Sequence, residues 1–306
     1  MSIIIDAAVC SNMGKIRKNN EDNFYFNGLY MDESQRNNGG LFNLSVSEPI
    51  QIYAVCDGMG GEEGGEDASI TAVRALMQYA KTTHKANGTE QLTELLQSIS
   101  DTIEDNAKKK GFHSGTTIAM VVICDDTIRV VHVGDSRVYC FENANLNRKT
   151  VDHSEVQRMY SMGLITKEEM DTHPKRHVIS QFLGMPRSDA MVAPTISERK
   201  KLQVGQRYLI CSDGLTDMVK DPEIERILGS AVNAEDAAKQ LTIAALHNGG
   251  KDNVTSICLF VGNDKSGRST LSLDKLKKKR TISICGMVLS GIAIASGLFL
   301  LIRNMI

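Results

Sequence analysis

Acidic residues recur beside glycine at the ends of apolar stretches of this sequence. Asp57-Gly58 follows the run from Gln51 to Cys56, and similar pairs occur at Gly134-Asp135 and Asp213-Gly214, with Asp252 after Gly249-Gly250-Lys251. The apolar runs are rich in β-branched and aromatic residues, which is typical of buried strands. Glycine has no Cβ and lets the backbone approach a ligand closely. One Asp-Gly is an ordinary turn signal, but the repetition predicts that several strands deliver carboxylates to one site.

Carboxylates without histidine or cysteine companions favour a hard divalent cation. Mg²⁺ and Mn²⁺ take oxygen ligands, and Mg²⁺ usually keeps several waters. Glu21 and Asp22 add two more carboxylates before another apolar run. Two ions that share a carboxylate can lower the pKa of a bridging water and orient it toward phosphorus. Arg17 would offer a planar guanidinium to two phosphate oxygens. The pattern therefore predicts metal-dependent chemistry on a phosphate ester.

Other phosphate-cleaving enzymes would need motifs that this sequence lacks. No cysteine is followed by arginine six positions later, which excludes the loop of a thiolate phosphatase. Asp125-Asp126-Thr127 is not an Asp-x-Asp-x-Thr nucleophile, and it fits a hairpin turn better. The G-x-x-x-x-G-K-[ST] motif of a nucleotide-binding P-loop is also missing.

Six short motifs follow one another along the chain in a specific order. They are R-K-N-N-E-D at 17–22, V-C-D-G-M-G-G at 55–61, S-G-T-T at 114–117, V-G-D-S-R at 133–137, C-S-D-G-L-T-D at 211–217 and G-K-D-N-V-T at 250–255. Over roughly residues 5–262 the sequence resembles a metal-dependent Ser/Thr protein phosphatase of the protein phosphatase 2C family, in its bacterial form. The block 152–174 resembles the flap of that family.

The resemblance implies a binuclear Mn²⁺ or Mg²⁺ site. Asp57 would bridge both ions, and Gly58 would offer its carbonyl oxygen. Asp213 and Asp252 would complete the ligands of the first ion, while Glu21 would hold the second ion largely through water.

The resemblance also assigns residues around the ions. Asp135 would bind a labile third ion together with Asp213, and Arg17 would grip the substrate phosphate. Asp22 and Asn253 would support the ligand residues without binding an ion themselves. Arg17, Asp57 and Asp135 are thus the residues expected to act in catalysis.

One position departs from the family pattern. Many eukaryotic members carry histidine directly after the Asp-Gly, as a proposed proton donor to the leaving group, and this sequence has Met59 there. Methionine cannot donate a proton, so a water on the third ion would take that role and increase the importance of Asp135. His132, His153 and His173 are alternative donors, although a structural or flap position suits each of them better.

Strand patterns occur in groups around a pair of helices, which is not the alternation of a parallel α/β sheet. We expect an α+β fold: a four-layer αββα sandwich of two antiparallel sheets flanked by helices, as the resemblance also implies. Residues 31–49 are expected to be a loop, and Asp67 an N-cap. Expected strands are 3–10, 23–30, 51–56, 117–124, 128–133, 137–141, 207–211 and 253–261, and expected helices are 67–84, 89–110, 154–162, 167–170, 222–229 and 234–247.

Composition narrows the protein class. The 306 residues carry a formal net charge of −2, so nothing indicates nucleic-acid binding. The seven cysteines are scattered without a Cys-x-x-Cys pair, which argues against zinc or disulfides and fits a reducing cytosol. Asp6 interrupts the apolar start, so a secretory signal is not expected.

Residues 281–302 contain no charged side chain. A helix of about 22 residues spans roughly 33 Å, enough to cross a bilayer core, although a buried core helix is the alternative. The basic run at 275–280 places residues 1–280 in the cytoplasm by the positive-inside bias. A stripe of small residues could dimerise weakly in the membrane, or could be ordinary membrane-helix composition; it comprises Gly286, Ser290, Ala293 and Gly297.

We therefore predict a catalytic domain at 1–262, a polar and then basic linker at 263–280 and a transmembrane helix at 281–302. The predicted enzyme hydrolyses phosphoserine and phosphothreonine in proteins. A short tether favours substrates close to the membrane, and a membrane Ser/Thr kinase with its targets is the candidate partner. The alternatives are an inactive membrane-tethered scaffold that binds phosphoproteins, and a phosphatase for small molecules.

Overall fold

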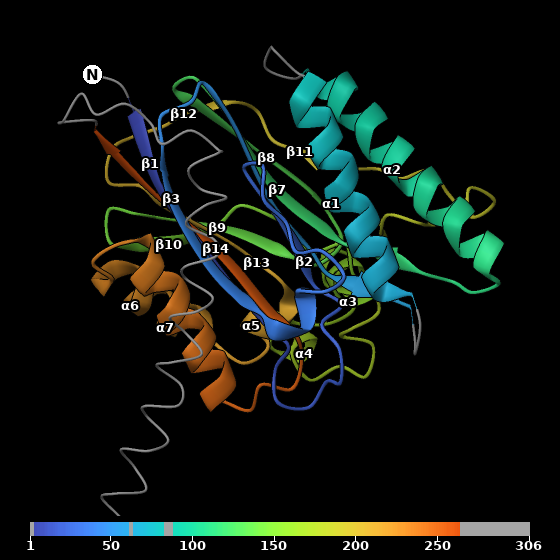
Figure 1. The fold of residues 1–306 in the computed structure, drawn as a ribbon. Coiled ribbons are helices and arrows are strands. Elements are labelled where there is room, and N and C mark those ends of the chain that lie inside the picture. The colour runs from blue at the N-terminus through green and yellow to red at the C-terminus, as the bar shows by residue number, and fades with distance from the viewer. Residues whose placement is uncertain (1–2, 61–63, 83–87, 264–306) are drawn as a thin grey trace, which may run out of the picture. The chain divides into compact units, whose positions relative to one another are not determined.

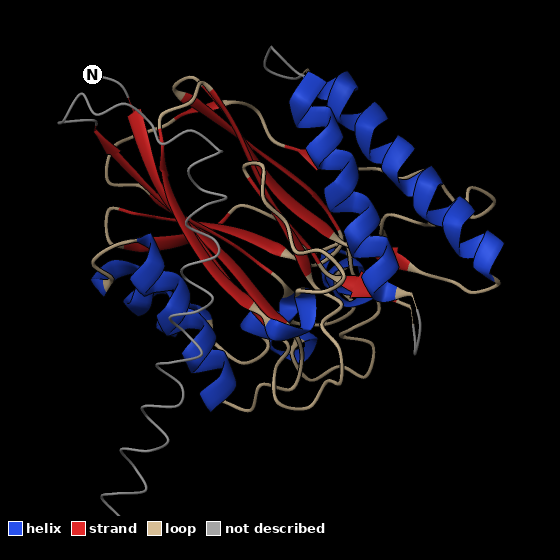
Figure 2. Cartoon of the chain, viewed as in Figure 1, coloured by secondary structure: helices blue, strands red, loops and turns tan. Residues whose placement is uncertain are grey.

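The computed structural model describes residues 3–60, 64–82 and 88–263. Its strands form two antiparallel sheets that lie between layers of helices (Figures 1 and 2). The α+β class and the two antiparallel sheets predicted from the sequence are confirmed.

The first sheet has the strand order β10-β9-β13-β14-β1-β3. Its longest pairing joins β1 and β14 from Ile3 opposite Asn263 to Asn12 opposite Val254. The bounds in sheet order are β10 (Asn145–Arg148), β9 (Arg137–Glu142), β13 (Arg207–Cys211), β14 (Val254–Asn263), β1 (Ile3–Asn12) and β3 (Gly40–Val46).

The second sheet has the order β11-β8-β7-β4-β2, and β12 also pairs with β8. A separate two-stranded sheet joins β5 and β6. The bounds are β11 (Thr195–Ile196), β12 (Lys200–Lys201), β8 (Thr127–Val133), β7 (Ile118–Cys124), β4 (Ile50–Cys56), β2 (Asn23–Phe26), β5 (Gly58–Met59) and β6 (Gly115–Thr116).

Helices cover the outer face of each sheet. The helices α1 (Gly65–Thr82) and α2 (Thr89–Lys110) share one apolar cluster with the second sheet, and α6 (Asp221–Ser230) and α7 (Ala234–His247) share another with the first. Ile52, Ala54 and Cys56 of β4 belong to the α1–α2 cluster. Because side chains alternate along a strand, Tyr53 and Val55 point toward the first sheet. Both are fully buried.

Three short helices lie at one end of the sheets. They are α3 (Glu155–Ser161), α4 (Lys167–Met170) and α5 (Asp213–Thr216) (Figure 1). The helix α3 begins where Ser154 Oγ accepts a hydrogen bond from the Gln157 N–H, which is an N-cap contact. The segment 152–190, which includes the flap-like block at 152–174 and continues beyond it, contains α3 and α4 and is named the flap.

Several predicted elements match the structure. The helices at 89–110, 167–170 and 234–247 and the strand at 207–211 are confirmed residue for residue. The hairpin between β7 and β8 turns at Asp125-Asp126 as predicted, with Asp125 at a φ of 52°. The other predicted helices and strands differ from their expected bounds by one to four residues, and the largest differences have local causes. The short strands β5, β6, β10, β11 and β12 were not predicted.

The predicted loop at 31–49 is wrong in part. It contains a 3₁₀ helix (Arg36–Asn38) and the edge strand β3. Leu44 and Val46 are buried between exposed neighbours, so the segment alternates as a half-buried strand does. The ten-residue strand β1 offers a free edge on which β3 pairs. The alternation of buried and exposed residues in β3 is short and follows glycines, so the local sequence did not predict a strand here.

The predicted strand at 23–30 ends early, at Phe26. Asn27 and Gly28 take φ angles of 43° and 99°, and the Phe26 N–H donates to the Leu29 carbonyl at 2.7 Å. Left-handed backbone of this kind ends a strand, and asparagine and glycine adopt it most readily.

Two helix assignments and one strand end also need correction. The helix α1 begins at Gly65, so Asp67 lies in its first turn and is not the N-cap; its carboxylate pairs with Lys110. The helix α5 begins on Asp213, where only a turn was expected. The strand β14 continues to Asn263 because Ile3 and Ile4 of β1 pair with its last two residues.

Among the described residues, no helix is both long and apolar enough to cross a bilayer. The predicted membrane helix at 281–302 and almost all of the predicted linker lie outside the described residues.

Candidate metal centre

Asp57 directly follows β4, and two threonines fix its main chain. Its N–H donates to Thr117 Oγ1 at 3.1 Å, and its carbonyl accepts from the Thr117 N–H and from Thr116 Oγ1, both at 2.9 Å. The next residue, Gly58, packs so closely that a Cβ there would lie 2.6 Å from the Glu21 carbonyl oxygen. Glycine is therefore required at 58, and it brings the segment around Glu21 against Asp57.

The ends of β13 and β14 supply two more carboxylates. These strands are neighbours in the first sheet; Asp213 follows β13 and Asp252 precedes β14. A Cβ on Gly214 would lie 2.0 Å from the carbonyl oxygen of Asn253. The glycine therefore lets Asp213 and Asp252 come together at the same end of the sheet.

Asn253 holds the N-terminal loop in place. Its side-chain N–H groups donate to the carbonyls of Met13 and Asn19 at 2.8 and 2.9 Å. Its Oδ1 accepts from the Glu21 N–H at 2.8 Å, a contact between residues 232 positions apart. One amide side chain thus positions the loop that carries Arg17 and Glu21 beside Asp252.

Five aspartates share one electrostatic environment. Burial, followed by the charges of Asp22, Asp213, Asp135 and Asp252, raises the pKa of Asp57 well above its ordinary value. Burial also raises the pKa of Asp213 to about 6 and of Asp22 to about 7, and it raises that of Asp135 strongly. Like charges close together resist ionisation. The carboxylates predicted from separate motifs therefore lie within electrostatic reach of one another.

The donor set fits a hard divalent cation. Asp22 Oδ1 and Asp135 Oδ1 are buried and have no hydrogen-bond partner among the described residues. An unpaired buried carboxylate oxygen is costly and calls for a compensating group. Arg17 offsets part of the charge: its guanidinium lies 2.7 Å from Asp252 and 3.5 Å from Glu21. Oxygen donors of this kind suit Mg²⁺ or Mn²⁺.

The raised pKa values predict how metal and pH affect stability together. In the unfolded chain Asp22 and Asp213 ionise near pH 4, whereas in the fold they hold protons to about pH 7 and 6. The fold binds more protons in this window, so the metal-free protein loses stability as pH rises from about 4 to 7. Metal binding requires ionised carboxylates. The rise in melting temperature on adding Mn²⁺ should therefore be larger at pH 7.5 than at pH 5.

Thermal unfolding with and without Mn²⁺ across this pH range checks the prediction. The Asp22→Asn variant should show a flatter pH dependence without metal, because one of the buried titrating groups is gone. Metal-free stability that increases from pH 5 to 7 would contradict the assignment.

The sequence and the structure both have known relatives. Residues 41–247 match the family described as protein phosphatase 2C. The serine/threonine phosphatase stp of Listeria monocytogenes is 32% identical over 83% of this chain and 95% of its own length. The phosphatase PstP of Mycobacterium tuberculosis is 31% identical over 84% of this chain and 45% of its own. This chain belongs to the protein phosphatase 2C family.

Solved structures of the family agree with the fold. The catalytic domain of PstP in complex with 2 manganese ions superposes with a TM-score of 0.70 at 28% identity, covering 86% of this chain and all of that domain. Stp1 of Staphylococcus aureus gives 0.70 at 31% identity over 84% of this chain and 95% of its own.

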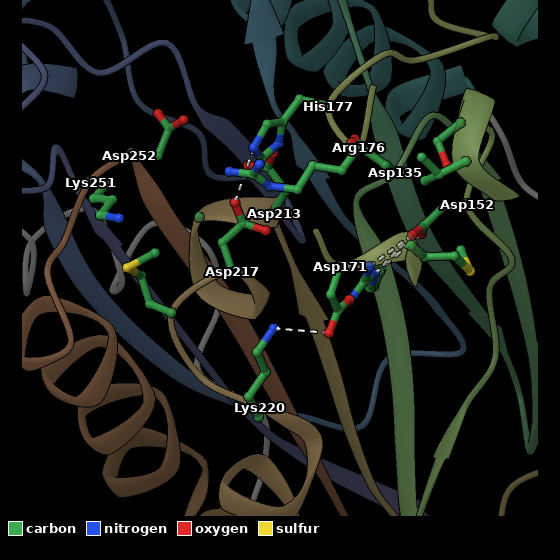
Figure 3. A pocket seen from close by; sticks show the side chains of 16 residues that line it. Asp135, Asp152, Asp171, Arg176, His177, Asp213, Asp217, Lys220, Lys251 and Asp252 are labelled. Carbon is green, nitrogen blue, oxygen red and sulfur yellow. Dashed lines mark hydrogen bonds and ion pairs between the residues drawn. The ribbon is translucent and has the colours of Figure 1, made fainter. Parts of the chain in front are cut away.

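In this member of the protein phosphatase 2C family, a cleft of about 350 Å³ opens between the cluster of aspartates and the flap (Figure 3). Asp135, Asp213 and Asp252 line it from the ends of the sheets, just outside the strands, and Arg176 and His177 line it from the flap. The cleft therefore borders the acidic centre on the side of Asp135, Asp213 and Asp252, while Asp57 and Arg17 are not among its lining residues.

Ion pairs fasten the flap on both sides of the cleft. Asp152, at the start of the flap, accepts from Arg137 at 2.8 Å and also pairs with Arg148. On the other side Lys220 lies 3.5 Å from Asp171, just beyond α4 (Figure 3). The flap is therefore held to β9 by a largely buried carboxylate, and it contacts the α5–α6 segment through an exposed ion pair.

The histidines considered as proton donors have other contacts. His132 is buried, and its Nε2 lies 2.8 Å from the Val151 carbonyl. His153 stacks on His132 with ring centroids 4.6 Å apart and contacts Thr195 Oγ1 at 3.0 Å. In the flap, His173 Nδ1 accepts from a backbone N–H two residues away. These contacts agree with the expectation that the three histidines have structural or flap positions.

Two residues at the cleft were not predicted as site residues: His177 and Asp217. Asp217 ends the motif at 211–217 and stands one helical turn after Asp213, a spacing that places both on one face. The spacing from Asp213 could therefore have identified Asp217 as a site residue from the sequence. His177 comes from the flap, and its approach to Asp217 depends on tertiary structure alone.

Proposed function

We propose that this chain hydrolyses phosphoserine and phosphothreonine in proteins, as a metal-dependent phosphatase of the 2C type. The observation that carries the proposal is that carboxylates from separate segments act on one another, and that buried oxygens of two of them, Asp22 and Asp135, are unpaired among the described residues. The carboxylates are those of Asp22, Asp57, Asp135, Asp213 and Asp252. The family membership and the two manganese ions of the PstP domain support it.

Different residues would hold the metal ions and position the metal ligands. Asp57, Asp213, Asp252 and Glu21 would hold two Mn²⁺ or Mg²⁺ ions, with the Gly58 carbonyl. Ions held there would supply a water of lowered pKa, oriented for attack on phosphorus. Asp135 would hold a labile third ion. Asp22 and Asn253 keep the ligands in position through Ser212 and the N-terminal loop.

Hydrolysis of phosphopeptides tests the proposal. The purified chain should release phosphate from phosphoserine and phosphothreonine peptides and from p-nitrophenyl phosphate in the presence of Mn²⁺, and EDTA should stop the release. The inactive-scaffold alternative predicts binding without turnover; the complete acidic set disfavours it. No metal-dependent release from any of these substrates would overturn the proposed activity.

Arg17 is proposed to bind the substrate phosphate. A charge-assisted contact contributes about 1.5–3 kcal/mol, so Arg17→Ala should lower kcat/KM for a phosphopeptide about 10- to 100-fold, mainly through KM. Arg17→Lys keeps the charge but not the planar fork and should fall between. Steady-state kinetics checks both variants, and Mn²⁺ uptake should persist in each. An unchanged KM for Arg17→Ala would exclude this role.

Residues 281–302 are proposed to form one membrane-spanning helix that holds residues 1–280 on the cytoplasmic side. The uncharged run and the basic residues at 275–280 support this. Replacing both Ile292 and Leu298 with Lys costs about 2.5–3.5 kcal/mol per residue in the bilayer. The wild type should stay in the membrane fraction after carbonate extraction, and the double variant should be released from it. A wild-type chain found only in the soluble fraction would contradict the anchor.

A membrane anchor restricts the substrates. We propose phosphoproteins at the membrane, including a Ser/Thr kinase and its targets, as the physiological partners. Weak dimerisation through the stripe from Gly286 to Gly297 is part of the same proposal. Phosphoproteomics of cells that carry Asp57→Asn would identify the substrates; an increase confined to soluble phosphoproteins would argue against the membrane restriction.

A further inference from the structure

Thr117 lies between the two turns that carry Asp57 and Asp135. It directly precedes β7, the strand that separates β4 from β8 in the second sheet. Asp57 follows the end of β4, and Asp135 comes just after the end of β8. Strands on either side of a third lie about 10 Å apart, so β4 and β8 cannot hydrogen-bond to each other directly. A group at the start of β7 is placed to connect them.

The Thr117 hydroxyl contacts both turns. Its Oγ1 accepts a hydrogen bond from the Asp57 N–H at 3.1 Å, and it lies 2.6 Å from Ser136 Oγ. Ser136 is the residue that follows Asp135. A hydroxyl has one proton and two acceptor lone pairs, so both hydrogen bonds can form at the same time. One side-chain oxygen therefore links the main chain at Asp57 to the neighbour of Asp135.

Both hydroxyl groups are shielded from solvent. Thr117 is 1% exposed, and Ser136 is fully buried. The Thr117 methyl group also packs on the second turn, because a Cβ on Gly134 would lie 2.6 Å from Thr117 Cγ2. Gly134 has a φ of 103°, which glycine adopts readily. The turn that contains Asp135 thus packs against Thr117 and is also hydrogen-bonded to it.

We propose that Thr117 and Ser136 are positioning residues, whose two hydroxyls set the spacing between Asp57 and Asp135 in the metal centre. This inference rests on the proposed function, because it concerns the orientation of carboxylates that would hold the ions. Neither hydroxyl would bind an ion or the substrate. Groups that orient metal ligands typically contribute about 10- to 100-fold to metal affinity or activity.

The competing explanation is that His153 alone fixes the second turn. The His153 N–H donates to the Gly134 carbonyl at 2.9 Å, and the Gly134 N–H donates to His153 Nδ1 at 3.3 Å. These contacts hold the main chain before Asp135 but do not reach Asp57. If they were sufficient, removing the Ser136 hydroxyl would leave the metal centre unchanged.

A double-mutant cycle on the full-length chain tests the two hydroxyls. Thr117→Val keeps the size of the side chain without its hydroxyl, and Ser136→Ala removes a single oxygen. Each should lower kcat for a phosphopeptide about 10- to 100-fold, with little change in KM because Arg17 is untouched. Calorimetry should show that each variant binds Mn²⁺ about tenfold more weakly. The double variant should lose no more than the worse single variant, because contacts within one hydrogen-bond network are not additive.

Two further variants separate positioning from stability. Thr117→Ser keeps the hydroxyl and loses the methyl group, so it should melt at a lower temperature than the wild type but retain most of its turnover and Mn²⁺ affinity. Thr242→Val is the matched control, because Thr242 is 4% exposed in α7, away from the metal centre. It should keep wild-type kcat and Mn²⁺ affinity.

Wild-type kcat and Mn²⁺ affinity in Ser136→Ala overturn the inference, and so do losses that simply add in the double variant. Ser136→Ala decides the matter by itself if Thr117→Val does not fold. Phosphopeptide hydrolysis by the wild type separates this inference from the proposed function. Wild-type turnover with unaffected variants removes only the positioning role. Weakened Mn²⁺ binding in the variants of a wild type without turnover removes only the phosphatase assignment.

Discussion

Replacing Asp57 with asparagine is expected to lower Mn²⁺-dependent hydrolysis of a phosphopeptide by a factor of about 10³ or more. Metal ions stabilise charge in the transition state by several kcal/mol, and each 1.36 kcal/mol corresponds to about tenfold in rate. Asp57 is placed to serve both ions of the proposed pair, so its loss should remove most of this stabilisation. Mn²⁺ uptake by calorimetry should fall together with activity.

The same variant has an effect that loss of folding would not produce. Burial and neighbouring carboxylates raise the pKa of Asp57 well above its ordinary value, so its charge destabilises the metal-free fold at neutral pH. Asparagine has nearly the same shape without the charge. Metal-free Asp57→Asn should therefore melt at a higher temperature than the metal-free wild type, and Mn²⁺ should raise that temperature less.

A matched control separates the site from general charge effects. Asp126 lies exposed in the β7–β8 hairpin and pairs with Lys201 at 3.4 Å. Asp126→Asn should keep wild-type turnover and metal uptake. Full Mn²⁺-dependent activity in Asp57→Asn would remove Asp57 from the metal centre.

Replacing Asp135 with alanine is expected to lower turnover about 100-fold while leaving the ions at Asp57 bound. Met59 follows Gly58 in β5 and carries no proton to donate. The labile third ion that Asp135 and Asp213 would hold would supply a water as the proposed proton donor. General acid catalysis contributes about 10²- to 10⁴-fold. The expected 100-fold loss is the lower limit of that range.

The loss should appear in kcat more than in KM, because Asp135 is not proposed to grip the phosphate. Asp135→Asn keeps the shape of the side chain and should be almost as slow as Asp135→Ala, which separates charge from packing. Single-turnover kinetics with calorimetric metal counting measures both effects. Unchanged turnover in both variants would refute the third-ion proposal.

The local sequence was sufficient for much of the fold. The helix at 89–110 repeats apolar residues at helical spacing and ends at Gly111, whose φ of 79° is the left-handed conformation that glycine favours. The turn at Asp125-Asp126 is equally local. Such features depend on neighbours a few residues away, which is why residue order alone predicts them. The strand β3 was missed because its pairing with β1 decides its conformation.

For the site, residue order is enough to show which carboxylates follow strands beside glycine, and these residue types favour hard cations. How the carboxylates come together depends on contacts between distant parts of the fold. Asn253 fixes Glu21 across 232 positions, and the flap brings His177 to Asp217. Contacts of this kind arise from the packing of whole sheets and of the flap. No periodicity within a few residues encodes them, so only the folded chain shows these two contacts.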